Sequence, residues 1–165
     1  MAAPTISDQS AFAAIGAALA DTVEAAVPTL RAMSESRAEQ PRAVGKWSPK
    51  QVIGHLIDSA ANNHQRFVRA QEGHAYTGPG YTQDHWVAVQ GYQESSWDDL
   101  VALWRAYNRH LARVIGRIPD SRRSTMCTIG TEAPMTLGFV ASDYVRHLRH
   151  HLAQAGALPE SSPSK

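Results

Sequence analysis

The strongest constraint on the fold is the spacing of apolar residues between Ser96 and Pro119. They recur every three or four positions, which is the period of one face of an α-helix. The stripe consists of Leu100, Leu103, Trp104, Tyr107, Leu111, Val114 and Ile118. We therefore predict a helix over this segment, with the stripe packed in the core and the proline ending it.

Two N-terminal segments also carry helical signals. The first, from about Ser7 to Ser36, is rich in alanine and apolar residues. Pro28 is expected to kink or split it, because proline lacks the amide hydrogen that a helix interior requires. The second begins in KWSPKQ, where Ser48 is a good N-cap and Gln51 completes a capping box. It is expected to run to about Gln71.

The last helix is predicted from about Leu137 to Ala155, with Thr136 as its cap and Gly156 as its stop. Between the second and third helices, glycines and proline in EGHAYTGPGYTQ indicate a loop, and DHWVAVQGY is typical of a partial helix. A short extended piece is expected around Met126–Ile129.

Four long helices without a convincing sheet indicate an all-α four-helix bundle. The connection over residues 73–95 is long, so we expect a crossover between helices two and three. The 165 residues are enough for one domain, predicted over residues 1–158, and the polar tail at 159–165 is expected to be disordered.

Charge and composition narrow the class of protein. The 16 basic and 15 acidic residues are dispersed and give a net charge of +1, which disfavours a nucleic-acid partner. The longest apolar stretch, residues 11–20, is half the ~20 residues of a membrane span, and no lysine or arginine precedes it. Cys127 is the only cysteine, which excludes an intrachain disulfide and fits a reducing compartment. We expect a cytoplasmic protein with no membrane partner.

The last helix holds a cluster of three histidines in DYVRHLRHHLAQ at 143–154. At about 100° per residue, His147 and His151 stack one turn apart beside the apolar face, whereas His150 points outward. An i, i+4 pair of imidazoles can chelate a divalent metal. A partly buried pair with hydrogen-bonded partners explains the same spacing, and the pattern alone does not choose between the two.

A polar stripe borders the apolar face of the second helix. It consists of His55, Ser59, Asn62 and Arg66. Such a stripe is either a solvated shoulder or the wall of a polar pocket. In a pocket, Arg66 could clamp a carboxylate with two parallel hydrogen bonds. The alternative for Arg66, which the pattern alone favours, is a surface ion pair with Asp58 or Glu72.

Three stretches of the chain resemble one known family. GKWSPKQVIGHLIDSAANNHQRFVRAQ at 45–71 is similar to the second helix of the DinB/YfiT-like superfamily, with its W-S-x-x-x-x-x-G-H-L motif. TLGFVASDYVRHLRHHLAQ at 136–154 resembles the closing helix and its H-x-x-x-H motif, and residues 80–104 resemble the middle section. The resemblance covers roughly residues 40–155.

The resemblance implies a four-helix bundle with a long crossover. It also implies a divalent metal, nickel or zinc, held by His55, His147 and His151. Characterised relatives include metal-dependent hydrolases, and transferases or isomerases that use a low-molecular-weight thiol such as bacillithiol or mycothiol. Homodimers are common among them. A small-molecule substrate follows from these activities.

Three imidazoles leave at least one coordination position open, as in catalytic rather than structural metal sites. The metal could activate a water molecule or keep a thiol as thiolate, and the sequence does not choose between them. Ser59, Asn62 and Arg66 are the candidate substrate-binding residues. Asp143, one turn before His147, is the candidate carboxylate that orients a ligand. Asp58 lies three residues after His55, but a surface charge is the preferred interpretation for it.

Two other hypotheses stay open. In one, a metal only staples helices two and four of a non-catalytic, stress-related binding module. In the other, the protein is a metal-free helical interaction protein. The remaining residues have ordinary structural explanations. Tyr81, Trp86 and Tyr92 are interpreted as packing aromatics, Cys127 as a small buried residue and His85 as a surface or boundary histidine, with a role at the site as the alternative for each. His64, His74 and His110 are interpreted only as surface or boundary histidines.

Overall fold

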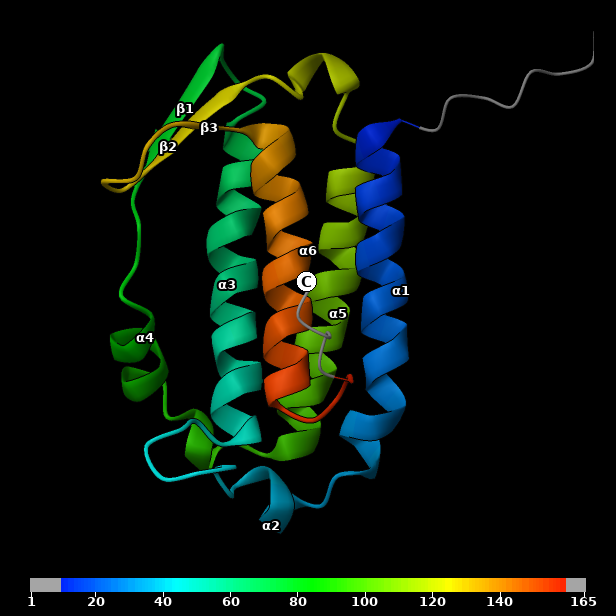
Figure 1. The fold of residues 1–165 in the computed structure, drawn as a ribbon, viewed down its shortest axis with the longest axis vertical. Helices are drawn as coiled ribbons and strands as arrows, with labels where there is room; N and C mark the ends of the chain where they lie inside the picture. The colour runs from blue at the N-terminus through cyan, green and yellow to red at the C-terminus, as the bar shows by residue number, and fades with distance from the viewer. Residues whose placement is uncertain (1–9, 160–165) are drawn as a thin grey trace, which may run out of the picture.

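Four long helices form the body of the molecule (Figure 1). The computed structural model describes residues 10–159. The four helices are α1 (Ala11–Ala32), α3 (Pro49–Arg69), α5 (Trp97–Gly116) and α6 (Leu137–Gln154). The predicted all-α four-helix bundle is thereby confirmed. Residues 7–9 of the first predicted segment and residues 160–165 of the predicted tail lie outside the described residues.

The bundle has an unusual order of neighbours. Helices α1 and α3 each pack against both α5 and α6, so the first two long helices lie on a diagonal. Figure 1 shows that α3 and α5 run in the same direction. Adjacent parallel helices need a connection that returns along the whole bundle, and residues 70–96 supply it. The predicted crossover between the second and third long helices is therefore present.

Short elements lie in the connections between the long helices. The turn after α1 carries α2 (Glu35–Ala38), and the crossover carries α4 (Gln83–Val89) and the 3₁₀ turn η1 (Tyr92–Glu94). A second 3₁₀ turn, η2 (Asp120–Arg122), follows α5. The partial helix expected in DHWVAVQGY is confirmed as α4.

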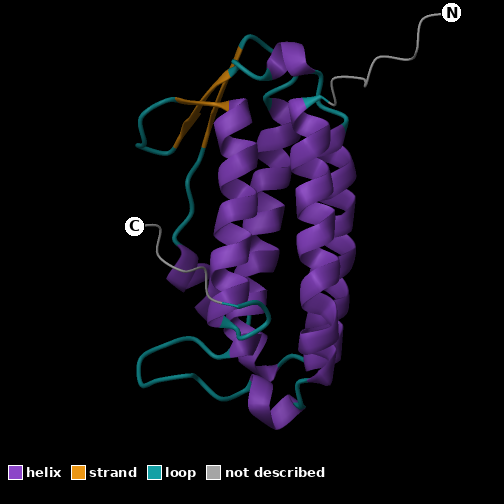
Figure 2. Cartoon of the chain, turned by 45° about the vertical axis from the view of Figure 1, so that its right-hand side comes forward, coloured by secondary structure: helices purple, strands orange, loops and turns teal. Residues whose placement is uncertain are grey.

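A three-stranded sheet covers one end of the bundle (Figure 2). Strand β1 (Ala75–Gly78) pairs in parallel with β2 (Met126–Ile129), and β2 pairs antiparallel with β3 (Met135–Thr136). The extended piece expected at β2 is confirmed, but the loop expected at β1 is wrong. Only four residues long and flanked by glycines, β1 carries no alternation that a sequence pattern could detect.

The predicted helix starts agree with the structure. Ser48 and Gln51 form the full capping box, and the Thr136 hydroxyl accepts a hydrogen bond from the amide of Phe139. Helix α1 continues through Pro28 and is not split. Pro28 and Glu24, whose carbonyl loses its partner, are both exposed, so water can satisfy that carbonyl.

The core is filled from all four helices, with one error in the predicted stripe. Leu103 is 51% exposed, whereas Val101 and Asn108 of the same helix are buried. The buried face of α5 is centred about 20° beyond Trp104, which leaves Leu103 outside it. Asn108 is tolerated there because it accepts a hydrogen bond from the Tyr144 hydroxyl and donates to the Trp104 carbonyl.

Helix α1 passes a test for a membrane span by length and composition alone, and it is the one helix within residues 10–159 that does. In this structure its buried residues pack against α5 and α6, as the apolar stripe of a bundle helix does.

Candidate metal centre

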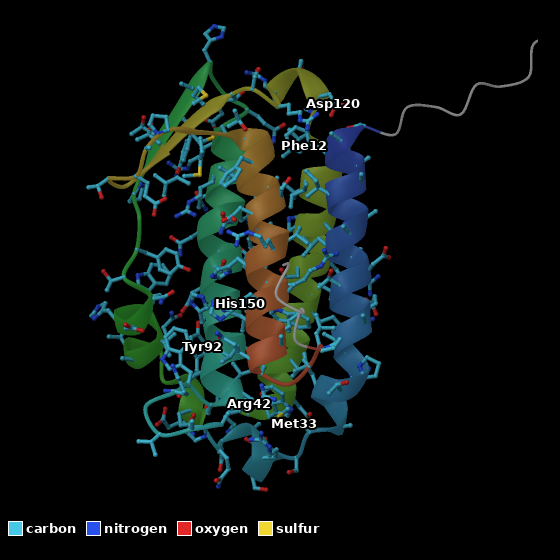
Figure 3. The ribbon with its side chains drawn as sticks, in the orientation of Figure 1. Phe12, Met33, Arg42, Tyr92, Asp120 and His150 are labelled. Atoms are coloured by element: carbon cyan, nitrogen blue, oxygen red, sulfur yellow. The ribbon has the colours of Figure 1, made fainter. Side chains whose placement is uncertain are left out.

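Helices α3 and α6 bring three histidines together near one end of the bundle. His55 comes from α3 and is 1% exposed, whereas His147 and His151 come from successive turns of α6 and are half-buried. One ligand atom from each lies within 4.8 Å of the other two. His150 is exposed on the same half of α6 (Figure 3). The structure thus brings together the three histidines that the resemblance implied.

The distances within this cluster suit a metal ion. Nε2 of His55 lies 3.3 Å from Nε2 of His147. Two nitrogens bound at ~2.0–2.1 Å to one tetrahedral ion lie about 3.3–3.4 Å apart, so this pair has the spacing of two ligands. The His151 ring centroid lies 4.6 Å from that of His55 and 4.4 Å from that of His147. A hydrogen bond explains the distance between His55 and His147 equally well, but it does not explain why the imidazole of His151 packs against both rings.

The three imidazoles are held in the uncharged form that binds metals. Burial, with smaller contributions from His151 and His147, lowers the pKa of His55 to about 3. Burial and then His151 lower the pKa of His147 to about 4, against the attraction of Asp143. Burial also lowers the pKa of His151, against its hydrogen bond with Gln154. At neutral pH no proton has to be displaced before a cation can bind.

One neighbour that was not predicted from the sequence fixes the orientation of His151. Nδ1 of His151 lies 2.8 Å from Oε1 of Gln154, an oxygen that can only accept. Nδ1 therefore carries the proton, and Nε2 is left bare for a metal. Gln154 also contacts Nε2 of His150 through its amide nitrogen at 2.9 Å. The i, i+3 spacing to His151 was the available signal.

His55 is positioned differently. The indole of Trp47 packs beside its ring, with centroids 5.1 Å apart, and Nδ1 is buried without a hydrogen-bond partner among the described residues. Trp47 belongs to the W-S-x-x-x-x-x-G-H-L motif, so the motif's tryptophan packs on the motif's histidine. The three histidines fit a cation well, because their uncharged imidazoles converge on one point and no positive charge lies among them.

A cavity of about 640 Å³ runs along the groove between α3 and α6 and ends at His147. Ser59 and Arg66 of the predicted polar stripe line it. Asn62 does not. Its side chain bonds the carbonyl of Asp58, and the buried Asn63 takes its place in the lining. Asn63 lies at about 20° on the helical wheel, inside the apolar face, so the stripe pattern excluded it.

The two carboxylates considered as orienting groups have separate partners. Asp143 lines the cavity beside His147 and forms an ion pair with Arg146 on its own helix. Its predicted role toward His147 stays a prediction. Asp58 is 2% exposed, so the surface charge expected for it is wrong. Its Oδ1 accepts hydrogen bonds from the Tyr92 hydroxyl and the Gln90 amide, both at 2.6 Å, which tie the crossover to α3.

The other residues considered at the sequence level divide between the cavity and the core. Tyr81 lines the cavity and packs edge-on against Trp86, at 5.3 Å between centroids. Tyr92 is buried, and Cys127 is fully buried with its pKa raised by burial, as a small core residue would be. His85 is exposed on α4 and is not in the histidine group.

A second cavity of about 420 Å³ touches the other side of the centre. His151 and Gln154 form one wall, and Trp47, Lys46 and Arg42 come from the segment between α2 and α3. The three histidines thus stand between two cavities, one reached past His147 and one past His151.

Two known proteins are similar to this chain over most of its length. A protein of Bacillus mycoides (strain KBAB4) is 24% identical over 131 residues, which cover 79% of this chain and 75% of that protein. YfiT of Bacillus subtilis (strain 168) is 23% identical over 138 residues, which cover 76% and 71%. Both names contain the words metal-dependent hydrolase.

Structural similarity points the same way. The solved structure of Bacillus subtilis YfiT, described as an unusual four-helix bundle, matches with a TM-score of 0.80 at 20% identity. The match covers 94% of this chain and 89% of that one, which supports the shared fold. The sequence model of the DinB superfamily matches residues 18–155. The chain therefore belongs to the DinB superfamily.

Proposed function

We propose that this protein is a metal-dependent enzyme of the hydrolase type that acts on a small molecule. The observation that carries the proposal is the position of His147, which belongs both to the cluster of uncharged imidazoles and to the lining of the 640 Å³ cavity. A substrate in that cavity reaches the centre directly. Nickel and zinc both suit three imidazole ligands.

A divalent ion with an open position supplies Lewis acidity, which activates water or polarises the bond to be cleaved. The chain's own residues do the rest. His55, His147 and His151 hold the ion, and Gln154 keeps the His151 proton on Nδ1. Arg66 and Tyr81 line the cavity, where they can bind and orient the substrate, and Val140 and Ile129 add apolar surface to its lining.

Cobalt substitution tests for an open coordination position. Protein purified without a histidine tag is loaded with Co²⁺, and its visible absorption is recorded with and without azide. We expect bands of a low-coordinate cobalt ion that shift on azide addition, in the wild type and in His150→Ala but not in His147→Ala. Failure to take up cobalt, or a spectrum that ignores azide, contradicts the proposal and favours a purely structural staple.

The second cavity favours one other candidate, a thiol-dependent S-transferase. A transferase needs room for two organic reactants beside the centre, and the cavity at Trp47 and His151 offers the second space. With the cobalt protein, glutathione, bacillithiol and mycothiol are added in turn. Thiolate bound to cobalt gives a near-ultraviolet band, and its absence with all three thiols removes this candidate while leaving the hydrolase intact.

The proposal includes a cytoplasmic homodimer without nucleic-acid or membrane partners. The small net charge argues against a nucleic-acid partner, the single, buried cysteine fits a reducing compartment, and the homodimer follows from the resemblance to the family alone. Light scattering on the purified protein measures the oligomeric state, and a monomer at micromolar concentration contradicts the dimer.

A further inference from the structure

The upper part of the 640 Å³ cavity contains a cation, Arg66, whose own ligand the proposed function does not name. Arg66 lies near the end of α3 and is half-buried in the lining. Its Nη1 donates to Oδ1 of Asn63 at 3.3 Å, and Asn63 is itself fixed by its bond to the Ser59 carbonyl at 2.9 Å. Arg66 is therefore held toward the cavity by a chain of three residues on one helix face.

This guanidinium forms no ion pair with a carboxylate among residues 10–159, and Asp58 and Glu72, expected as partners, are not bonded to it. Glu132 attracts it electrostatically from the exposed loop between β2 and β3 without reaching ion-pair distance. Burial lowers the pKa of Arg66, yet an arginine keeps its charge in proteins. Most of its five donors are left for another acceptor.

The neighbours of Arg66 suit a single negative charge. Ser59, Asn63 and Tyr81 are uncharged and can donate or accept hydrogen bonds. Asp143, the other acid in the lining, is already paired with Arg146. One planar fork among neutral polar groups matches the two oxygens of a carboxylate, whereas a dianionic phosphate usually meets several cations or backbone amides.

The distance from Arg66 to the histidine cluster sets the length of a ligand that would reach both. Arg66 follows His55 by eleven residues on α3, which is about 16 Å along the helix axis. Helix α6 runs antiparallel, so the cavity continues from Val140 near the sheet down to His147. The lining of the cavity is mixed: Val140, Ile129 and Met135 are apolar, and Ser59, Asn63 and Thr131 are polar.

We propose that this cavity binds an elongated monocarboxylate, with its acid group on Arg66 and its body along the α3–α6 groove against the side chains of Val140, Ile129 and Met135. The inference deepens the proposed function, on which it rests only for the location of the bond that reacts, at the His147 end. The binding of the acid at Arg66 does not depend on the metal.

The test is a calorimetric titration with straight-chain monocarboxylates from acetate to decanoate, each matched to its neutral amide. Because a carboxylate can also bind a metal ion, both metal-loaded and metal-stripped protein are used. We expect affinity to rise with chain length, and each longer acid to bind about tenfold or more tightly than its amide. This charge preference is expected in both forms of the protein.

Three variants assign the preference to its source. Arg66→Gln is expected to abolish the difference between acid and amide, and Glu132→Gln to tighten acid binding a few-fold by removing a repulsive charge. Arg69→Gln, a change at an exposed arginine of the same helix, is the matched control. It should leave the affinity for the acid and the difference between acid and amide unchanged. Decyl phosphate is expected to bind no more tightly than decanoate.

Three results would overturn the inference: no binding of any acid in the series, amides that bind as well as acids, or an acid preference that survives Arg66→Gln. Tighter binding of decyl phosphate than of decanoate would refute the assignment to a carboxylate. A protein that binds acids through Arg66 but shows no open cobalt position separates the two proposals, because the ligand assignment then stands while the hydrolase does not.

Discussion

The ring of Tyr92 packs against Gly54, so closely that a Cβ atom on this glycine would sit 2.1 Å from Cδ2 of the tyrosine. Gly54 is the glycine of the W-S-x-x-x-x-x-G-H-L motif and directly precedes His55. The hydroxyl of the same tyrosine donates to Asp58. The contact therefore packs the crossover connection onto α3 beside the metal centre, and the motif needs glycine because no side chain fits there.

Gly54→Ala is expected to destabilise the protein by about 2–3 kcal/mol, because the added methyl displaces the Tyr92 ring and strains its bond to Asp58. Urea unfolding followed by circular dichroism measures this loss. Gly116→Ala is the control, since it is also in a helix but its Cβ meets nothing nearer than 4.0 Å, and it should be neutral or stabilising. Equal effects of the two substitutions would contradict the packing argument.

Removing any one of His55, His147 or His151 is expected to reduce metal content from about one ion per chain to a small fraction, because two imidazoles bind far more weakly than three. His150→Ala, one residue from a ligand but exposed, is the matched control. Elemental analysis of the tag-free proteins provides the measurement. A His147→Ala variant that keeps its full metal content would show that the ion lies elsewhere.

Gln154→Leu is expected to weaken metal binding about 10- to 100-fold without unfolding the protein, because His151 loses the acceptor that holds its proton on Nδ1. Competition with a chromogenic chelator gives the affinity, and the melting temperature reports on folding. Gln65→Leu, on the exposed side of α3, controls for the loss of a surface amide. Unchanged affinity in Gln154→Leu would mean that the hydrogen bond has no role in binding.

The metal-free protein is expected to lose stability as the pH falls below about 6.5. The folded-state pKa values of His55 and His147, about 3 and about 4, lie below the ordinary value of 6.5. The unfolded chain therefore binds protons that the folded chain refuses, and the stability present above pH 6.5 is lost progressively toward pH 4. Asp143 opposes the effect at His147 only in part.

Differential scanning calorimetry checks this dependence. Between pH 7 and pH 5 the melting temperature of the metal-free protein should fall by about 5 °C or more. The fall should be smaller in His55→Gln, which removes the most strongly shifted imidazole. A melting temperature that stays constant or rises over this interval would mean that the three rings are not kept neutral by the fold.

The helices and their starts were predictable from local signals, since the capping box at Ser48 and the apolar periodicity act within a few residues. Leu103 shows the limit of that approach, because its spacing fits a stripe but the phase of the buried face depends on which helices pack against α5. Strand β1 was missed for a similar reason, because its partner β2 lies about fifty residues later.

The grouping of the three histidines was predictable, but their surroundings were not. The helical wheel separated His147 and His151 from His150, and the resemblance supplied His55. Asn63 was not predicted because it lies within an apolar helix face, and Gln154 because it lies on an exposed one. Only tertiary packing shows what these two side chains contact. The burial of Asp58 depends in the same way on the crossover that covers it.

His55 and His147 are separated by 92 positions in the chain, and α6 follows the other three long helices in the sequence. A ribosome-bound chain that still lacks α6 carries only one of the three imidazoles, so it cannot capture a metal ion in this geometry. Closing a loop of that length has an entropic cost that must be met by the packing of α6 against α3 and α1 before the rings meet. If these histidines hold a metal ion, the ion can therefore bind only late in folding, and its tight binding would report that the whole bundle has been assembled.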